Sequence, residues 1–128
     1  MSDYLIDGQL VDDEKDGDWI EYFANGNKRR EGKYVDGKKE GKWILYHPNG
    51  NKKSEATFRN GLFEGWYVAY HKNGNTFRAG DYGPHEGKSY DGRKEGVWHD
   101  YAEDGKTVRQ QVTYKHGKIV ERLVFEVD

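Results

Sequence analysis

The stretch Gly17-Asp18-Trp19-Ile20-Glu21-Tyr22 decides the fold of this chain because it returns three more times. Two copies follow at intervals of 24 residues, Gly41-Lys42-Trp43-Ile44-Leu45-Tyr46 and Gly65-Trp66-Tyr67-Val68-Ala69-Tyr70. A further copy, Gly96-Val97-Trp98-His99-Asp100-Tyr101, starts 31 residues after the third, so seven residues are inserted before it. Self-similarity at a fixed period of this length predicts an array of stacked, similar units.

The repeat divides the 128 residues into units without leaving a linker, which predicts one domain over residues 1–128. Tyr82 still aligns with Tyr34 and Phe58 without a gap, so we place the insertion after it, near residues 83–89. The predicted units are a partial unit at 8–16, full units at 17–40, 41–64, 65–95 and 96–118, and a closing strand at 119–127. The chain therefore holds about four and a half units.

Turn signals recur at half the repeat length. Seven of the eight are Asn-Gly or Asp-Gly, at positions 25–26, 36–37, 49–50, 60–61, 73–74, 91–92 and 104–105, and the eighth is His116-Gly117. These dipeptides accept the positive φ angles that a two-residue type I′ hairpin turn requires. We therefore predict an all-β protein, an antiparallel β-meander of short strands in which each unit is a hairpin.

A two-residue loop at Asn25-Gly26 would fix the register of the first hairpin. It predicts three cross-strand pairs, which are Trp19 with Gly32, Glu21 with Arg30 and Phe23 with Lys28. The later hairpins repeat the first of these pairs as Trp43 with Ala56 and Tyr67 with Gly80. A large ring that faces a residue with little or no side chain can lie over it and bury the exposed backbone. This packing explains why Gly or Ala stands opposite each ring.

The register also sorts the aromatic side chains onto the two faces of the sheet. One is the tryptophan face, to which we assign a structural role; its rings are Trp19, Trp43, Tyr67 and Trp98 with Tyr34, Phe58 and Tyr82. The other is the tyrosine face, which carries Ile20, Ile44, Val68 and His99 with the ladder Tyr22, Tyr46, Tyr70 and Tyr101. Because both faces are aromatic and no helix is expected to cover either, we predict a single-layer or strongly curled sheet.

The composition favours a thin, ordered protein over a thick core or a disordered chain. Hydrophobic residues make up 34% and charged residues another 34%, yet aromatics reach 15% and stand at regular intervals. A net charge of −2 gives no overall attraction to phosphate backbones, so nucleic-acid binding is disfavoured. The chain has no cysteine, no signal-like N-terminus and no apolar run long enough to span a membrane, so we expect a soluble cytoplasmic protein.

Histidines and acidic residues that could bind a metal or catalyse a reaction are present, but their spacing does not match a known kind of site. The five histidines, His47, His71, His85, His99 and His116, lack the close spacings of metal ligands. Acid pairs stand beside predicted turns, and the chain has no nucleophile elbow, phosphate loop or dinucleotide fingerprint. We therefore predict no enzymatic activity, no metal and no cofactor. Acidic residues interrupt the basic runs, which disfavours membrane binding.

Two features are candidates for partner recognition. The tyrosine ladder is either a structural stack or an interface, since exposed tyrosines are common at binding hot spots. The insertion breaks a strict period, and loops on a rigid scaffold often carry recognition, which makes His85, Glu86 and Tyr90 candidates. An enzyme site in this loop, through His85 and Glu86, is the alternative interpretation. The closing strand at 119–127 would leave an open sheet edge available for self-association.

The units resemble MORN repeats of the variant class, because Gly-x-Trp-x-x-Tyr is followed by Asn-Gly and a second Tyr-x-x-Gly, most clearly at 17–40 and 41–64. Bacterial proteins built from this variant include antitoxin or immunity proteins of similar size. The resemblance therefore implies a protein that neutralises a protein toxin or effector by binding it. Other MORN proteins act as scaffolds or at anionic phospholipid membranes, which is the alternative that the resemblance implies. The chain departs from the pattern at Tyr67, which replaces Trp, and at the insertion.

Overall fold

The computed structural model describes residues 4–6, 9–11, 16–83 and 92–125. Within them are eleven β-strands and no helix, so none of these residues forms a helix that could cross a membrane. The strands are β1 (Tyr4–Ile6), β2 (Gln9–Val11), β3 (Gly17–Tyr22), β4 (Lys28–Val35), β5 (Lys38–Tyr46), β6 (Lys52–Arg59), β7 (Leu62–Tyr70), β8 (Thr76–Tyr82), β9 (Lys94–Tyr101), β10 (Val108–Lys115) and β11 (Lys118–Val124). The predicted all-β class is confirmed.

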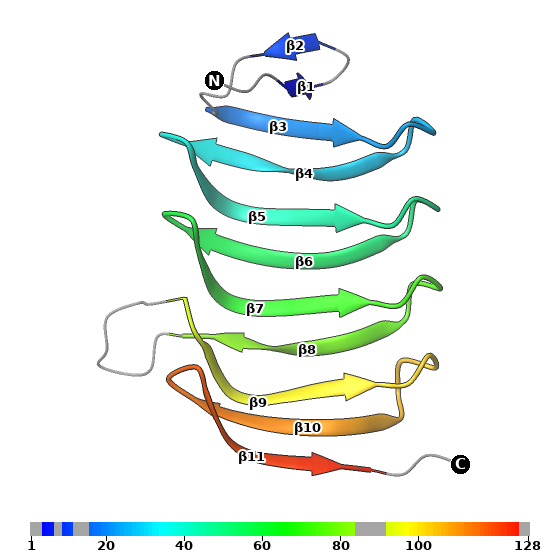
Figure 1. The fold of residues 1–128 in the computed structure, drawn as a ribbon, viewed down its shortest axis with the longest axis vertical. Helices are drawn as coiled ribbons and strands as arrows, with labels where there is room; N and C mark the ends of the chain where they lie inside the picture. Colours follow the sequence, from blue (N-terminus) through cyan, green and yellow to red (C-terminus); the bar gives the residue numbers. More distant parts are fainter. Residues whose placement is uncertain (1–3, 7–8, 12–15, 84–91, 126–128) are drawn as a thin grey trace.

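Nine of the strands form one open antiparallel sheet in which each strand lies beside its neighbours in sequence. The sheet runs from β3 at one edge to β11 at the other, and Figure 1 shows the strands stacked as rungs along the long axis of the molecule. β1 and β2 pair only with each other among the described strands, in a hairpin that lies beside β3. The prediction of a single antiparallel β-meander is confirmed.

The turns that follow β4, β6 and β10 are the two-residue type I′ turns that the sequence predicts. Asp36, Asn60 and His116 have φ angles of 51°, 50° and 53°, and each is followed by a glycine with positive φ. The residues on either side of the turn pair directly, as Val35 does with Lys38. Aspartate, asparagine and histidine are the side chains that enter this left-handed region most readily, so the local sequence sets these turns.

The turn after β3 corrects the prediction of a two-residue loop. The N–H of Phe23 donates to Asn27 O at 2.8 Å, and the N–H of Gly26 donates to Phe23 O at 2.9 Å. Gly26 has a φ of 90°, whereas the asparagine before it keeps a negative φ. This is a three-residue loop, a type I turn followed by a left-handed glycine. The extra residue pairs Tyr22 with Lys28, so the predicted pair of Phe23 with Lys28 is wrong.

Strands β5, β7 and β9 bend at the glycine of the repeated stretch. Gly41, Gly65 and Gly96 have φ angles of 73°, 68° and 71°, in the region that only glycine enters freely. Across the bend the register slips: Glu31 pairs with Ile44, but two residues on, Lys33 pairs with Glu40. The surplus residues form a bulge that bends the strand near its start (Figure 1). The single layer is therefore curled.

The predicted pairs of large with small residues are confirmed, namely Trp19 with Gly32, Trp43 with Ala56 and Tyr67 with Gly80. The ring that covers Gly32, however, is that of Trp43, from the next hairpin. A Cβ atom on Gly32 would stand 2.1 Å from the Trp43 indole, whose Nε1 donates to Lys33 O at 3.0 Å. The prediction that Trp19 covers Gly32 is wrong, because each ring reaches back onto the preceding hairpin.

The same contact recurs between the third and fourth hairpins. A Cβ atom on Gly80 would stand 2.1 Å from the indole of Trp98, so the prediction that Tyr67 covers Gly80 is also wrong. Between the second and third hairpins, Tyr67 is the cross-strand partner of Ala56. Where the ring is tryptophan the residue beneath it is glycine, and where the ring is the smaller tyrosine it is alanine. These contacts hold successive hairpins together.

The core lies on the tryptophan face. Trp19, Tyr34, Trp43, Phe58 and Trp98 are buried there, with Tyr67 and Tyr82 half-buried. Trp43 and Trp98 are each only 2% exposed. Neighbouring rings meet edge to face, as Tyr34 and Trp43 do with centroids 4.8 Å apart, and Lys39 lies over the Trp43 ring at 5.1 Å. Ring contacts across the strands thus replace a thick core.

Side-chain hydrogen bonds join the turns along one side of the sheet. Asn25 and Asn27 both donate to Pro48 O, at 2.9 and 2.8 Å. Asn49 and Asn51 donate in the same way to Lys72 O, and Asn73 and Asn75 to Glu103 O. The fourth turn has Asp104 in this place, which accepts from the N–H of Thr107 instead. The ladder therefore depends on the tripeptide Asn-Gly-Asn. It ends at the fourth turn, where Asp104-Gly105-Lys106 replaces this tripeptide.

Carboxylates join the turns along the opposite side. Glu40 Oε2 accepts the N–H of Asn60 at 2.8 Å, and Glu95 Oε2 accepts that of His116 at 3.0 Å. Each of these glutamates directly precedes a bend glycine, so one motif supplies the bend and the cap of the next turn. With both rows of turns linked, the sheet is a rigid support for whatever its faces carry.

Candidate protein-binding face

The tyrosine ladder forms one row across the sheet. Tyr22, Tyr46, Tyr70 and Tyr101 are the last residues of β3, β5, β7 and β9. Successive rings stand two strands apart, about 10 Å. Tyr22 is exposed and the other three are half-buried. Each ring is therefore partly accessible to solvent and stands at a fixed position on a strand. A residue that binds a partner needs both properties.

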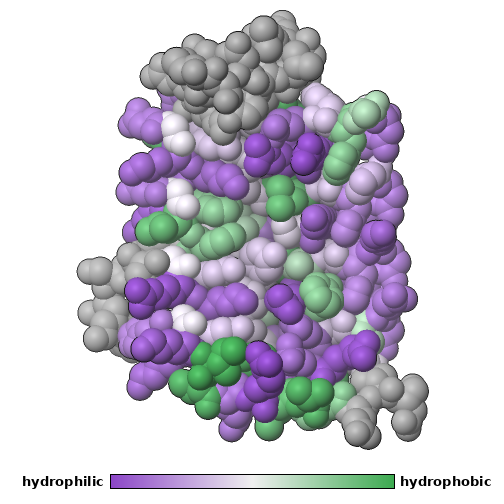
Figure 2. All heavy atoms as spheres, viewed as in Figure 1, coloured by the Kyte–Doolittle hydropathy of each residue, from purple (hydrophilic) through white to green (hydrophobic). Residues whose placement is uncertain are grey.

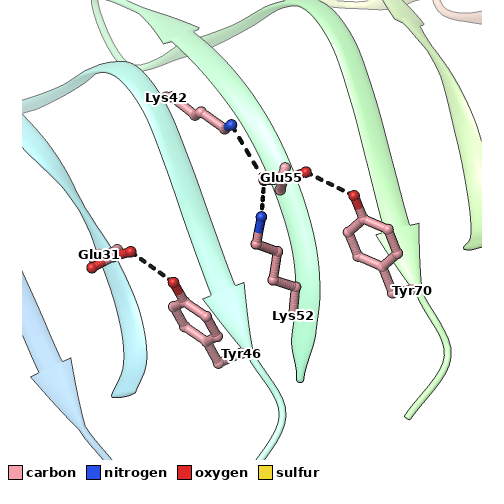
Figure 3. Close-up of polar contacts among 6 residues, drawn as sticks. All are labelled: Glu31, Lys42, Tyr46, Lys52, Glu55 and Tyr70. Atoms are coloured by element: carbon pink, nitrogen blue, oxygen red, sulfur yellow. Dashed lines mark hydrogen bonds and ion pairs between the residues drawn. The ribbon is translucent and has the colours of Figure 1, made fainter. Parts of the chain in front are cut away.

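Two of the four hydroxyls are held by glutamates on the preceding strand. The hydroxyl of Tyr46 donates to Glu31 Oε1 at 2.6 Å, and that of Tyr70 donates to Glu55 Oε2 at 2.7 Å (Figure 3). Burial raises the pKa of both tyrosines to about 12, and the carboxylate beside each hydroxyl adds to the shift. The two rings are therefore fixed in orientation and neutral at physiological pH.

Both glutamates also bind lysines. Lys28 Nζ lies 2.9 Å from Glu31. Lys52 and Lys42 lie 2.7 and 3.3 Å from Glu55, as Figure 3 shows. The hydrogen bond from Lys52, joined by smaller contributions from the other partners, lowers the pKa of Glu55 from 4.5 to about 2. The lysine side chains are largely exposed, so these ion pairs add little to stability. Their main effect is to place positive charge beside the tyrosine rings.

The face changes character at the third hairpin. The residue that aligns with the two glutamates is Ala79, which is buried together with its cross-strand partner Val68. The Tyr101 ring accordingly has no glutamate at the equivalent position and lies against His99, with ring centroids 6.1 Å apart. The tyrosine face is thus polar and charged over the first two hairpins and apolar over the third.

Two open grooves border the first two hairpins, each of about 370 Å³. One is lined by Glu21, Phe23, Arg29, Arg30, Leu45, Tyr46 and Lys53. The other is lined by Asp18, Trp19, Ile20, Glu31, Gly32, Lys33, Lys42 and Ile44. In the first, the Arg29 guanidinium lies over the Phe23 ring at 5.7 Å. Open grooves lined by both apolar and charged residues suit the protruding side chains of another protein. A small ligand is usually held in a more enclosed pocket.

Comparison with known families accounts for the repeated construction. Residues 15–36 and 39–60 match the family described as the MORN repeat variant. The chain carries MORN variant repeats. The two matched segments contain Tyr22 and Tyr46, together with the glutamates Glu31 and Glu55 that hold the hydroxyls of Tyr46 and Tyr70. No curated protein matches the chain.

The MORN repeats place the predicted partner-binding residues in two groups. The four tyrosines come together in one row on one face, as the alternation of side chains along the strands predicts. The three candidates in the insertion, His85, Glu86 and Tyr90, lie outside the described residues. The part of the candidate face that the structure defines is therefore the tyrosine row and the groove at Ile20, Glu31 and Ile44. The other groove opens at Glu21, Arg30 and Leu45, which pair with one another on the tryptophan face, and it reaches the row at Tyr46.

Sequence reasoning missed three residues that line a groove on the first two MORN repeats, Phe23, Arg29 and Lys53. A two-residue loop sets Arg29 opposite Tyr22, whereas the three-residue turn pairs Tyr22 with Lys28 and leaves Arg29 at the register shift. A signal for Phe23 was present, because the residue after the repeated tyrosine is His47 and His71 in the next two units. A departure from the repeat at a half-buried position was the clue.

The histidines at one position of the second and third repeat units, His47 and His71, bind backbone carbonyls. Nε2 of His47 lies 3.1 Å from Tyr70 O, and Nε2 of His71 lies 2.9 Å from Tyr101 O, which links each hairpin to the next. Within the described ranges, no group of three or more histidine, cysteine or acidic side chains is placed to hold a metal ion. These two rings are part of the turn ladder.

Proposed function

We propose that this protein binds another protein through the tyrosine face of strands β3 to β7 and acts as an antitoxin or immunity protein that neutralises a toxin or effector. The observation that carries the proposal is the pair of fixed rings, Tyr46 and Tyr70, beside lysine–glutamate clusters and open grooves. Rigid tyrosines bury much surface for little loss of side-chain entropy, and the charges around them select the partner.

Neutralisation by occlusion requires a rigid complementary surface and no catalytic group. The sheet supplies rigidity through its turn ladders and ring contacts, so little ordering is needed on binding. The bacterial antitoxins that the repeats resemble act in this way. We propose accordingly a cytoplasmic binding protein that works without enzymatic activity, metal or cofactor.

The test begins with affinity capture of the full chain from its native cells, followed by co-expression with the captured protein. We expect a partner whose toxicity is relieved by the full chain. Lys42→Glu puts a negative charge beside Glu55 and should weaken binding about tenfold or more. Lys106→Glu makes the same charge change in the loop after β9 and should leave the affinity within about twofold. Equal effects of the two variants, or no captured protein, would overturn the proposal.

Sedimentation with vesicles separates this function from that of a membrane-surface scaffold. Anionic and neutral vesicles are compared at low and high salt, because lipid binding through lysines weakens as salt rises. We expect no more protein with anionic than with neutral vesicles. Salt-sensitive sedimentation that Lys42→Glu abolishes, without a protein partner, would favour the scaffold.

A further inference from the structure

β11 is an edge strand of the main sheet and is hydrogen-bonded to a strand on one side. Within the described residues it pairs only with β10, whereas at the opposite edge the β1–β2 hairpin lies beside β3. The backbone groups on the outer side of β11 therefore face outward along a strand of seven residues, Lys118–Val124. Such a strand is a template on which one more strand can form.

The apolar side chains at this edge are exposed. Ile119, Val120, Leu123, Val124 and Phe125 are 49%, 60%, 42%, 70% and 44% exposed. Figure 2 shows apolar surface gathered at the end of the molecule where β11 lies. Proteins usually blunt sheet edges with charges, prolines or short strands, and contiguous exposed apolar residues mark interaction sites. β11 carries such charges at Lys118, Glu121 and Arg122, but Val120 and Val124 remain more than half exposed beside them.

A basic groove lies at the start of the same strand. It has a volume of about 470 Å³ and is lined by Arg93, Lys94, His116, Gly117 and Lys118. Glu95 stands nearby, but its carboxylate accepts the backbone N–H of His116. The hairpin at 108–124 has four basic residues and one acidic residue, in a chain of net charge −2. The groove therefore favours an acidic group on whatever lies against β11.

A second copy of this chain is the poorer occupant of the edge. Facing residues of antiparallel strands share a sheet face, so a two-fold pair of β11 strands must be centred on a residue. Val120 forms a bulge, since Ile119 and Glu121 pair with neighbouring residues of β10, so the regular part of β11 allows registers centred on Glu121 and on Arg122. They put Glu121 opposite Glu121 and Arg122 opposite Arg122, respectively. Like charges directly opposite destabilise a pair of strands.

We infer that β11 accepts an extended segment of another protein as an additional strand, and that this segment is apolar with acidic residues at the end over the basic groove. Strand addition of this kind takes its affinity from backbone hydrogen bonds and its specificity from the side chains. The apolar side chains of the segment pack on those of Val120 and Val124, and its carboxylates meet Lys118. The inference does not depend on the tyrosine face.

The backbone that pairs with the segment can be named. The N–H of Phe125 donates inward to Arg109 O at 2.8 Å. Because the direction of the backbone groups alternates along a strand, those of Val124 and Arg122 point outward. Val124→Pro therefore removes an outward donor without breaking a hydrogen bond to β10, and proline is tolerated at such an edge position.

The experiment titrates a fluorescent eight-residue peptide, alternating valine and threonine and ending in two glutamates, into the full-length protein. We expect saturable binding, with amide shifts in a ¹⁵N spectrum concentrated in β11. Replacing the two glutamates by lysines should weaken binding about tenfold or more. N-methylation of alternate peptide residues should abolish it, because the peptide then lacks the N–H groups that a strand pair needs.

Protein variants separate backbone pairing from side-chain contact. Val124→Pro should weaken binding about tenfold or more, whereas Val124→Ala, which keeps the N–H, should cost less than about threefold. Lys118→Glu should weaken binding about tenfold, and Lys106→Glu, in the loop after β9, should change it by less than about twofold. Should Val124→Pro fail to fold by circular dichroism, the N-methylated peptide tests the same hydrogen bonds from the other side.

Three results would overturn the inference. The first is absence of saturable binding of the acidic peptide. The second is equal binding of the lysine or N-methylated peptides. The third is a dimer of the free protein that Val124→Pro dissociates, since a second copy would then occupy the edge. None of these results bears on the effect of Lys42→Glu, so the failure of this inference and that of the proposed function can be told apart.

Discussion

Replacing Gly32 by alanine should disrupt the contact that joins the first hairpin to the second. The new methyl carbon would stand 2.1, 2.2 and 2.6 Å from three indole carbons of Trp43. Carbon atoms in contact are ordinarily about 3.5–4.0 Å apart, so the ring would have to move by more than about 1 Å. The ring is 2% exposed and its Nε1 donates to Lys33 O at 3.0 Å, which leaves little room to move.

The expected cost follows from these contacts. Overpacking a filled site costs about 1–3 kcal/mol, and loss of the indole hydrogen bond adds about 1 kcal/mol. Alanine is favoured over glycine within a strand by about 0.5–1 kcal/mol, which offsets part of this. We expect Gly32→Ala to lower the free energy of unfolding by about 2–3 kcal/mol, a large fraction of the stability of a small domain.

The third unit shows how the same chain relieves this clash. Ala56 stands in the glycine position and pairs with Tyr67 in place of tryptophan. Trp43→Tyr alone loses the indole hydrogen bond and leaves space, at a cost of about 2 kcal/mol. In the double variant Gly32→Ala/Trp43→Tyr the methyl group occupies that space. We expect the double variant to lose at least about 1.5 kcal/mol less than the sum of the two single effects.

Urea unfolding of the four proteins of this cycle, followed by circular dichroism, measures the coupling. Gly96→Ala is the matched control, because Gly96 has a φ of 71° and nothing within 4 Å of its Cβ position. Its cost should come from backbone strain alone and add to that of Trp43→Tyr within about 0.5 kcal/mol. If Gly32→Ala and Trp43→Tyr are additive within the same limit, the reasoning about ring cover is refuted.

Three further variants test the contacts around the tyrosine face and the turns. The pKa of Glu55 is lowered from 4.5 to about 2, so its stabilising effect is present above pH 4.5 and is lost as the pH falls toward 2. The difference in unfolding free energy between the wild type and Glu55→Gln should shrink over that window in urea titrations, and a constant difference would contradict this. Tyr46 has a pKa raised to about 12 from 10.0, so stability should fall as the pH rises between these values, and Tyr46→Phe should remove part of the fall. An ultraviolet absorbance titration of the same variant should show one tyrosine fewer ionising near pH 12, where Tyr70 and Tyr82 still titrate. Asn49→Asp keeps the acceptor for the N–H of Asn51 but removes the donor to Lys72 O, so thermal unfolding should show a loss of about 1 kcal/mol, whereas unchanged stability would mean that the ladder contributes nothing.

The strands and their pairing were predictable because short-range chemistry sets them. Asp36-Gly37 and Asn60-Gly61 take the type I′ geometry that their residues favour, and this fixes the order of the strands. The pair of Trp19 with Gly32 followed from counting residues away from a turn. The count survived the error in loop length because the extra residue Arg29 restores the register, so the type I turn at Gly26 shifted only the pairs next to it.

The identity of the ring that covers each glycine was not predictable from the pairing register. Pairing states which residues stand opposite each other, but not where a long side chain leans. The Trp43 ring reaches Gly32 of the preceding hairpin after a bulge at Gly41 that adds residues to one strand only. A bulge of this kind depends on the tertiary arrangement of two hairpins, and the glycine that permits it reads in sequence like any turn glycine.

The tyrosine row was predictable, while the grooves beside it were not. Side chains alternate along strands, so a tyrosine recurring at one strand position must form a row. The hydrogen bond from the Tyr46 hydroxyl to Glu31 on the neighbouring strand was not predicted from the sequence. The groove at Phe23 and Arg29 arises at the register shift, and no periodic rule locates it.

Irregularities in the repeat differ in whether the fold compensates for them. Tyr67 in a tryptophan position is matched by Ala56 in a glycine position, so this departure is a packing solution. At the start of β11 the turn His116-Gly117 aligns Val120 with Glu40 and Glu95, the carboxylates that cap the following turn. Valine has no side-chain oxygen and cannot accept a turn N–H in this way. Val120 is instead 60% exposed, which folding alone does not favour, and a strand added by a partner is the arrangement that would bury it.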